Sequence, residues 1–246
     1  FDLIYGLPYQ TLESVAATID QVAALRPDRI AFYSYAHVPW IKPGQRSYTD
    51  KDLPADAYKR ALYELGLEKF RALGYTDIGM DHFALPGDAL YEALQRKTLH
   101  RNFMGYTTCH TDLLLGLGVS SISDAKYAYL QNEKKVEDYA ARMATGELAV
   151  FKGHFLTEED LRVRDHILGI ACKGELTWQP GLPGVPHEIF GETLGQMERE
   201  GLVTLEPGKL TVTPLGKAFV RNICMVFDRR QPAPHHAGQQ VFSKAI

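Results

Sequence analysis

Polar side chains that could bind a ligand occur along three predicted strands, close to the points where the strands end. The three segments are residues 2–6 (DLIYG), 35–37 (YAH) and 80–82 (MDH). Ligands of parallel sheets and barrels bind at the carboxyl ends of the strands. Because carboxylate and imidazole groups are strong hydrogen-bonding partners, this distribution predicts a ligand site along one edge of a sheet.

A segment rich in glycine, threonine and serine follows these strands at residues 99–123, with the sequence LHRNFMGYTTCHTDLLLGLGVSSIS. Gly116 and Gly118 suit a close approach of the backbone to a ligand, or tight packing. His100 and Arg101 could meet an anion, whereas the structural alternative pairs Arg101 with an acid such as Asp112. Spacing alone leaves the role of this segment open.

Three widely separated cysteines, Cys109, Cys172 and Cys224, form neither a disulfide framework nor a zinc motif. Such spacing is typical of a chain in a reducing cytoplasm. Cys109 and His110 are adjacent, which makes joint chelation of one metal ion difficult, so we expect a loop role for them. The sequence contains no run of about 18 apolar residues and no signal peptide. We therefore expect a cytoplasmic protein without a membrane segment.

The elements that would position these residues alternate between strand and helix. Residues 1–4 read as a strand, residues 11–25 as a helix ended by Pro27, and residues 30–38 as a second strand. A long helix begins at Pro54 and ends at Gly74, and a third strand follows at residues 75–80. This alternation predicts a parallel α/β sheet.

The chain opens inside a strand at Phe1 and has no initial methionine. A parallel sheet of two or three strands would leave unpaired edges, which soluble proteins avoid. We therefore expect further strands before Phe1, and interpret the chain as a fragment. Its 246 residues, 45% hydrophobic and 23% charged, are ordinary for a globular protein, and the net charge of −3 indicates no polyanionic partner.

The last third of the chain predicts a different, mainly helical unit. Thr157 and Asp160 form a near capping box before a helix, and a second helix runs from Pro186 to Gly201. Residues 202–213 (LVTLEPGKLTVT) predict a hairpin, and Thr213 precedes a last helix. This order is that of a winged helix. We therefore predict two domains, residues 1–150 and residues 151–246.

A winged helix raises the alternative of a DNA-binding protein, whose recognition helix would be residues 186–200. That helix carries four glutamates against a single arginine, Arg199. A helix that enters the major groove should be basic. The acidity of residues 186–200 therefore argues against a nucleic-acid partner.

Several long blocks resemble one enzyme family. They are DLIYGLPYQT, GMDHFALP, LHRNFMGYTT, DLLLGLGVSSIS and RNICMVFD, and their order is that of the oxygen-independent coproporphyrinogen III oxidases. These are radical S-adenosylmethionine (SAM) enzymes of heme synthesis. The related heme-chaperone branch differs at residues 80–84. A heme-binding chaperone is nevertheless an alternative, for which His235 and His236 in the tail would be the candidate ligands.

The resemblance implies the C-terminal portion of a partial (β/α) radical SAM barrel, followed by the winged-helix-like domain. In the family, a C-x-x-x-C-x-x-C motif that binds a four-iron four-sulfur cluster lies upstream of the segment matching Phe1. None of the three cysteines of this chain has that spacing. We therefore expect that this chain holds no metal site and does not turn over by itself. We also expect a monomer.

The resemblance also implies a reaction. The reduced cluster cleaves SAM to a 5′-deoxyadenosyl radical, which takes a hydrogen from a propionate of coproporphyrinogen III. Carbon dioxide leaves and a vinyl group remains, and two such events give protoporphyrinogen IX. An electron donor and an unidentified electron acceptor are required. The cofactors supply the difficult chemistry, while the protein orients and shields.

Four residues match positions that contact SAM in the family, which binds two SAM molecules. They are Asp2, Ala36, Met104 and Ile122. We expect Ala36, through its backbone, and Ile122 at the first SAM, and Asp2 at the second, where its carboxylate could accept bonds from ribose hydroxyls. Met104 stands where some members have glutamine, and a thioether cannot donate an amide hydrogen bond. The structural alternatives are a strand-end acid satisfied locally for Asp2 and plain sheet core for Ile122.

The substrate carries four propionates, so cationic and hydrogen-bonding groups should surround it. Arg101 is the principal candidate, and His82 and His37 could bond a carboxylate or a pyrrole. The alternative for either histidine is to cap the end of a strand.

Overall fold

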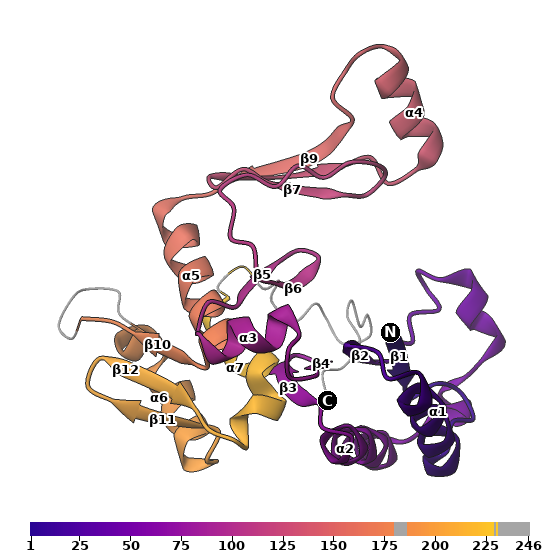
Figure 1. The fold of residues 1–246 in the computed structure, drawn as a ribbon. Coiled ribbons are helices and arrows are strands. Elements are labelled where there is room, and N and C mark those ends of the chain that lie inside the picture. The colour runs from indigo at the N-terminus through magenta and orange to yellow at the C-terminus, as the bar shows by residue number, and fades with distance from the viewer. Residues whose placement is uncertain (180–185, 229, 231–246) are drawn as a thin grey trace.

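The computed structural model describes residues 1–179, 186–228 and 230 (Figure 1). Its central sheet has the strand order β1-β2-β4-β3. The strands are β1 (Asp2–Tyr5), β2 (Arg29–Ser34), β3 (Thr76–Gly79) and β4 (His82–Ala84). β1 and β2 are parallel, whereas β4 lies between β2 and β3 and is antiparallel to both.

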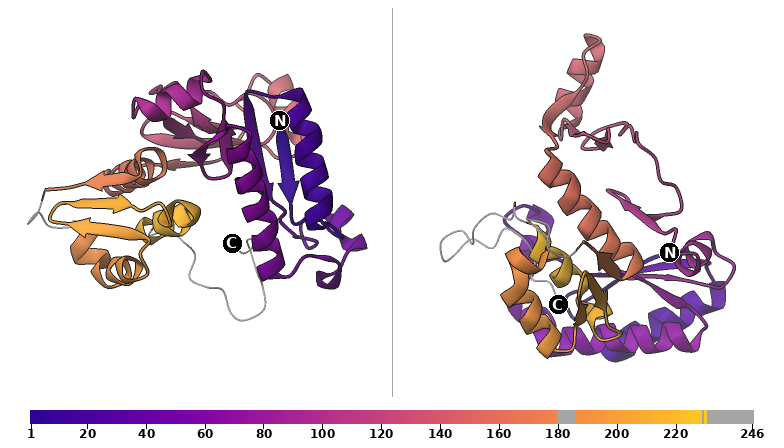
Figure 2. Two further views of the ribbon diagram at one scale, coloured as in Figure 1. Left: turned by 60° about the horizontal axis from the view of Figure 1, so that its bottom comes forward. Right: turned by 90° about the vertical axis from the view of Figure 1, so that its left-hand side faces the viewer.

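Two long helices cover one face of this sheet, α1 (Leu12–Leu25) and α2 (Asp56–Ala72) (Figure 2). The predicted start of α1 is confirmed, because Thr11 caps the helix in a capping box with Ser14. The predicted end of α2 is confirmed as well, with Gly74 in the left-handed region at φ 89°.

The core between the helices and the sheet is aromatic. Tyr5 and Phe32 lie with ring centroids 4.6 Å apart, Phe32 and Phe70 5.4 Å, and Phe70 and Phe83 4.9 Å. All four side chains are almost completely buried. Because successive side chains of a strand point to opposite faces, Asp2, Ile4 and Tyr33 lie on the face that the helices do not cover.

The three predicted strands run in one direction, but the sheet is not parallel throughout, because β4, which was not predicted, is antiparallel to both of its neighbours. β3 is followed by a two-residue turn in which Met80 and Asp81 have φ values of 38° and 74°. This turn reverses the chain, so that His82 begins β4 and does not lie at the end of a strand. The second predicted strand is also shorter than expected and ends at Ser34.

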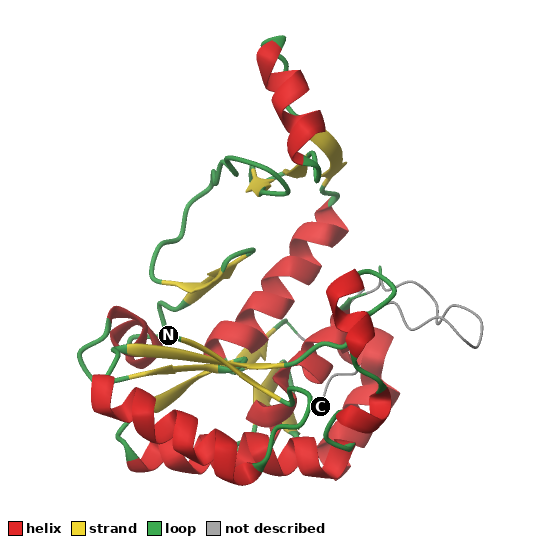
Figure 3. Cartoon of the chain, turned by 90° about the vertical axis from the view of Figure 1, so that its right-hand side faces the viewer, coloured by secondary structure: helices red, strands yellow, loops and turns green. Residues whose placement is uncertain are grey.

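A short hairpin lies over the uncovered face of the sheet (Figure 3). It consists of β5 (His100–Asn102) and β6 (Gly105–Thr107), in which Arg101 pairs with Tyr106. Helix α3 (Ala89–Gln95) precedes it and is capped by Asp88.

Residues 122–155 form an arm that projects from the rest of the molecule (Figures 1 and 3). Its antiparallel sheet contains β7 (Ile122–Asp124), β8 (Ala128–Asn132) and β9 (Val150–Phe155), and α4 (Val136–Ala144) connects β8 to β9. The sequence analysis did not anticipate this sheet, because its strands are short and interrupted by polar residues.

The C-terminal unit contains the predicted helices and hairpin. Its elements are α5 (Glu158–Leu168), a π-helical turn η3 (Gly169–Lys173), β10 (Glu175–Thr177), α6 (Pro186–Arg199), β11 (Val203–Glu206), β12 (Lys209–Val212), η4 (Gly216–Phe219) and α7 (Val220–Phe227). The capping box of Thr157 and Asp160 is confirmed. β10, which was not predicted, pairs with β12 and makes the hairpin a three-stranded sheet.

The C-terminal unit shares one hydrophobic core with the edge of the central sheet. Ile78 and Tyr106 belong to the same buried cluster as Ile170, Ile223 and Phe227. The predicted domain boundary at residue 150 falls at the first residue of β9, and the division into two domains stays a prediction. Two short 3₁₀ turns complete the fold, η1 (Pro43–Ser47) and η2 (Asp50–Asp52).

The aromatic core generates a test of packing. Gly66 is buried in α2, and a Cβ added there would fall within the ring of Phe32. Gly195 in α6 has only the end of the Arg199 side chain nearby, at 3.6 Å. We expect Gly66→Ala to lower the free energy of unfolding by about 1–3 kcal/mol through overpacking. Gly195→Ala should instead raise it by up to about 1 kcal/mol through helix propensity. Urea unfolding midpoints measure both, and equal effects would contradict the packing described.

Candidate functional site

The loops at the carboxyl ends of β1 and β2 are held by long polar side chains in place of backbone pairing. Gln10 accepts through Oε1 from the N–H groups of Gly6 (2.6 Å) and Leu7 (3.2 Å). Its Nε2 donates to the carbonyl of Ile4 at 3.1 Å. One side chain therefore satisfies three backbone groups at the end of β1 and fixes the turn that follows.

Gln45 does the same for the loop after β2. Its Oε1 accepts from the N–H of Val38 at 2.6 Å, and its Nε2 donates to the carbonyl of Ala36 at 3.0 Å. The Ala36 carbonyl thus has a partner within the chain. His37 lies beside Tyr35, with the Tyr35 hydroxyl 3.4 Å from Nδ1.

Lys59 joins these two loops from α2. Its Nζ donates to the carbonyl of Tyr35 at 3.0 Å, and burial lowers the pKa of its amine. Gly6, at φ 81°, lies against the Lys59 stem, because a Cβ at Gly6 would be 2.8 Å from Cε. Gln10, Gln45 and Lys59 were not predicted as site residues, since nothing in their spacing indicates which backbone groups they meet.

His82 contacts Tyr33 at the uncovered face of the sheet, and the charges of Asp2 and Arg101 act on the same tyrosine. The Tyr33 hydroxyl lies 3.4 Å from Nε2 of His82. Burial raises the pKa of Tyr33, the Asp2 carboxylate raises it further, and the Arg101 guanidinium opposes both. The structure therefore brings together three of the predicted site residues.

The expectation that Asp2 ends its strand is wrong, because Asp2 is the first residue of β1. It is exposed and pairs in register with Ala31, which in turn pairs with His82. The Asp2 carboxylate therefore lies on the uncovered face at the amino end of β1. It does not lie at the edge of the sheet where the carboxyl ends of the strands meet. His82 also has a structural role, since its Nδ1 donates to the Met80 carbonyl at 2.9 Å within the β3–β4 turn.

Arg101 is anchored by aromatic stacking. Its Cζ lies 4.9 Å from the centroid of Tyr106, and the Tyr106 hydroxyl donates to the carbonyl of Ala171 at 2.8 Å. The alternative pairing with Asp112 is not found, because the Asp112 carboxylate lies 3.3 Å from Nζ of Lys126. Nη1 of Arg101 is buried and has no hydrogen-bond partner among the described residues.

The other predicted residues are more distant along the fold. Met104 lies at the tip of the β5–β6 hairpin and is 86% exposed. Ile122 begins β7 in the arm, half-buried, where its backbone lies against Gly116. Ile122 therefore lies in a different sheet from Asp2, and Ala36 lies in the loop after β2.

The cysteines do not gather in one place. Cys109 is exposed on the loop after β6, whereas Cys172 and Cys224 are buried in η3 and α7. Within the described ranges, no three histidine, cysteine or acidic side chains converge as a metal ion would require. His235 and His236 lie outside the described residues.

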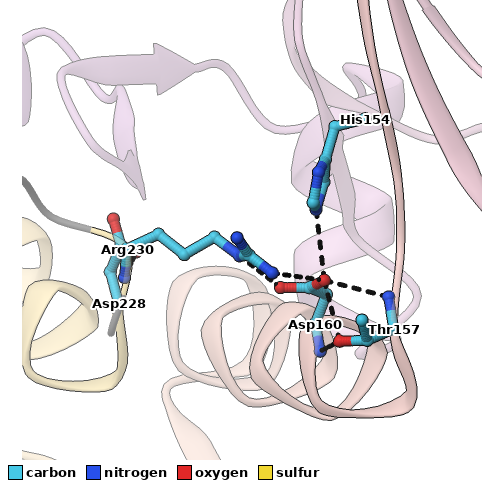
Figure 4. Close-up of polar contacts among 5 residues, drawn as sticks. All are labelled: His154, Thr157, Asp160, Asp228 and Arg230. Carbon is cyan, nitrogen blue, oxygen red and sulfur yellow. Dashed lines mark hydrogen bonds and ion pairs between the residues drawn. The ribbon is translucent and has the colours of Figure 1, made fainter.

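A cavity of about 790 Å³ lies between the β5–β6 hairpin, the arm and α5. Its wall includes Asp160, which is the centre of a polar cluster (Figure 4). Asp160 accepts two bonds from Arg230, at 2.6 and 2.9 Å, and lies 3.1 Å from Nε2 of His154. It also accepts from the N–H and hydroxyl of Thr157, both at 2.9 Å.

These bonds, led by those from Arg230, hold the pKa of Asp160 well below its usual range. Through these donors, Asp160 links β9, α5 and the chain after α7. A carboxylate that accepts so many hydrogen bonds is a poor general base. On the same wall His100 packs against His110, with ring centroids 4.6 Å apart, and burial lowers the pKa of His100.

None of the helices in the described ranges combines the length and the apolar character that crossing a membrane requires. Helix α6 carries the exposed acids Glu192 and Glu198, and the exposed Glu200 directly follows its last residue, Arg199. That surface lacks the positive charge expected of a helix that enters the major groove.

No family model matches the chain. The chain is 40% identical over 254 residues to the oxygen-independent coproporphyrinogen III oxidase of Pseudomonas aeruginosa, covering 100% of this chain and 54% of the relative. The corresponding protein of Thermostichus vulcanus is 39% identical over 254 residues, covering 100% of this chain and 77% of the relative.

A solved structure of the coproporphyrinogen III oxidase of Escherichia coli, described as a radical SAM enzyme, superposes with a TM-score of 0.86 at 39% identity. It covers 94% of this chain and 54% of that one. The chain spans about half the length of the first of these relatives and of the solved structure. The predicted α/β fold of a radical SAM enzyme is confirmed by this match.

The two hydrogen bonds of Gln45 act as a clamp on the loop after β2, and their contribution to the order of that loop can be tested. Gln45→Glu keeps the acceptor for Val38 but removes the donor to the Ala36 carbonyl. This variant loses one hydrogen bond and leaves a carboxylate oxygen facing the Ala36 carbonyl oxygen. The free energy of local opening of the loop should therefore fall by about 1–2 kcal/mol. Amide exchange at Val38 should then accelerate by roughly tenfold or more. Gln131→Glu in the arm, whose Nε2 donates to the Ser120 carbonyl, is the matched control and should leave Val38 unchanged. Equal exchange at Val38 in all three proteins would show that the clamp contributes nothing.

The cluster around Asp160 generates a test of pH dependence. A carboxylate whose pKa is lowered on folding stabilises the protein above its unfolded pKa of about 3.9, and this stabilisation is lost as pH falls below it. Asp160→Asn should therefore lower the thermal midpoint at pH 7, with the difference from the parent narrowing below about pH 4. Asp20→Asn, which removes an exposed pair with Lys69 at 2.7 Å, should change the midpoint little. A constant difference between Asp160→Asn and the parent from pH 7 to pH 3 is the outcome that contradicts the assignment.

Proposed function

Because the chain belongs to the oxygen-independent coproporphyrinogen III oxidase family, we propose that the complete protein converts coproporphyrinogen III to protoporphyrinogen IX. The observation that carries this proposal is the match along 100% of the chain at about 40% identity to proteins with that name. An identity of this extent covers the sheet, the hairpin, the arm and the C-terminal unit together.

The reaction is an oxidative decarboxylation of two propionate side chains. In each, one C–H bond and the bond to the carboxylate break, a carbon–carbon double bond forms, and carbon dioxide leaves. One hydrogen atom is taken by a radical and one electron passes to an acceptor, so each event needs a radical source and an oxidant. Bound SAM supplies the radical. The electron donor and acceptor are separate partners that we do not identify from this chain.

The uncovered face of the central sheet is suited to SAM and to the substrate. The Asp2 carboxylate is exposed there and could accept two hydrogen bonds from ribose hydroxyls. At the end of β2 the Ala36 carbonyl is engaged by Gln45, so a contact from Ala36 would come from its N–H. Ile122 and Met104 would have to approach from the arm and the hairpin tip. We assign Ala36 and Ile122 to one SAM and Asp2 and Met104 to a second.

Arg101, His82 and His37 are the proposed contacts to the substrate. The buried Nη1 of Arg101 is a strong donor without a partner among the described residues, which suits a propionate carboxylate. His82 presents Nε2 to the same face, because Nδ1 is occupied by the turn. The role of these groups is to bind and orient the propionates.

The residues of this chain do not fit an iron–sulfur cluster. Such a cluster needs cysteine thiolates that converge on the iron atoms, whereas Cys109 is exposed and Cys172 and Cys224 are buried in the C-terminal unit. Burial raises the pKa of Cys172 to about 11 and that of Cys224 to about 12, which disfavours the thiolate. The ligands would therefore come from elsewhere in the complete protein, which we expect to be a cytoplasmic monomer.

The role of Asp2 can be tested in the complete protein under anaerobic conditions. Asp2→Ala removes the proposed acceptor for the ribose hydroxyls and should raise the KM for SAM by roughly tenfold or more, since hydrogen bonds to a charged group contribute about 1.5–3 kcal/mol. Protoporphyrinogen formation should fall at limiting SAM and recover in part at saturating SAM. Asp20→Ala on α1 is the control and should behave as the parent. An unchanged rate for Asp2→Ala at limiting SAM would reject the role.

A further inference from the structure

We propose that Tyr106 is a positioning residue, which holds the Arg101 guanidinium in place to receive a substrate carboxylate. We infer further that the C-terminal unit sets this position through the carbonyl of Ala171. The identity of the carboxylate as a propionate rests on the function proposed above. The positioning itself rests on contacts within the described chain.

The first contact is the stacking of Arg101 on Tyr106. The two residues face each other across the β5–β6 hairpin, and the guanidinium carbon lies 4.9 Å from the ring centroid. The guanidinium is a planar fork whose N–H groups match a carboxylate, and a contact over the ring limits the directions in which this fork can point. Since Nη1 is buried without a partner among the described residues, the stacked position leaves one donor free.

The second contact fixes the ring. Tyr106 is only 9% exposed, and its hydroxyl donates to the Ala171 carbonyl at 2.8 Å. Ala171 lies in η3, the π-helical turn at the end of α5, and such turns change the local pattern of helical hydrogen bonds. The hairpin is therefore tied to the C-terminal unit by a bond between a buried hydroxyl and a buried turn.

The central sheet is shaped to receive this tyrosine. Gly79 at the end of β3 has a φ of 126°, and a Cβ there would be 2.7 Å from the Tyr106 hydroxyl oxygen. The His82 ring packs edge-on against Tyr106, with centroids 5.5 Å apart. Tyr106 thus contacts the sheet, the hairpin and the C-terminal unit at one point.

The charges around Arg101 favour an external carboxylate. Asp81, in the β3–β4 turn, forms an ion pair with Arg221 of α7. Asp2 is exposed, and its charge and that of Arg101 shift the pKa of Tyr33 in opposite directions. Arg101 therefore has no dedicated acidic partner in the described chain, and its buried donor is unsatisfied until an anion or water reaches it.

A double-mutant cycle on the complete protein tests the inference. The probe is coproporphyrin III, the fluorescent oxidised form of the proposed substrate, and the control probe is its tetramethyl ester. The variants are Tyr106→Phe, which keeps the ring and removes only the bond to Ala171, Arg101→Met, and the two combined. Tyr129→Phe in the arm, where Tyr129 packs 4.9 Å from Phe103, is the matched control for loss of a tyrosine hydroxyl.

We expect Arg101→Met to raise the Kd for coproporphyrin III by roughly tenfold to a hundredfold, and Tyr106→Phe by roughly two- to tenfold. The double variant should bind no more weakly than Arg101→Met alone, because Tyr106 acts only through Arg101. Arg101→Lys should not restore binding, since an ammonium lacks the planar stack. Binding of the ester and all binding by Tyr129→Phe should be unaffected.

The outcomes separate the inference from the function on which it rests. Additive effects of Tyr106→Phe and Arg101→Met on the Kd would overturn the positioning role and leave the function standing. If the parent does not bind coproporphyrin III, the substrate assignment fails, and a cycle on the urea unfolding midpoint then decides the positioning role. A coupling of Tyr106 and Arg101 in that cycle supports it, and additivity rejects it.

Discussion

The burial of one face of the central sheet is the constraint on which the candidate site depends. Tyr5 and Phe32 are almost fully buried beneath α1 and α2, and this fixes the alternation of side chains along β1 and β2. Asp2, Ile4 and Tyr33 are thereby turned to the uncovered face. A slip of one residue in either strand would exchange the buried and the exposed side chains of that strand. The strand register that buries the aromatic rings therefore also places the polar side chains at the site.

Local polar ties then give this face its shape. The amides of Gln10 and Gln45 take the place of neighbouring strands by donating and accepting at backbone groups that would otherwise lack partners. Each tie uses both ends of an amide, which explains why glutamine serves where glutamate would repel a carbonyl. The loops after β1 and β2 are thus ordered without regular secondary structure, a useful property where a flat ligand must approach the backbone.

The C-terminal unit packs directly against the central sheet and the β5–β6 hairpin. It shares a hydrophobic core with β3 and β6, and several polar contacts cross the junction, among them Tyr106 to Ala171 and Arg221 to Asp81. Both contacts end beside Arg101 or the β3–β4 turn. A movement of α7 or η3 would therefore shift Asp81 or Tyr106, which lie next to His82 and Arg101, the proposed contacts to the substrate.

The sequence by itself determined the helices α1, α2, α5, α6 and α7, the β11–β12 hairpin, the α/β class and the family, because periodicity, capping residues and long motif blocks are local or linear signals. It also identified Asp2, His82 and Arg101 as polar residues worth attention. Only the tertiary structure decided that β4 runs antiparallel, because a two-residue turn at Met80 carries little signal in one sequence. It alone brought Arg101 onto Tyr106 and Tyr106 onto Ala171, since these contacts join segments whose pairing depends on packing and not on their own composition.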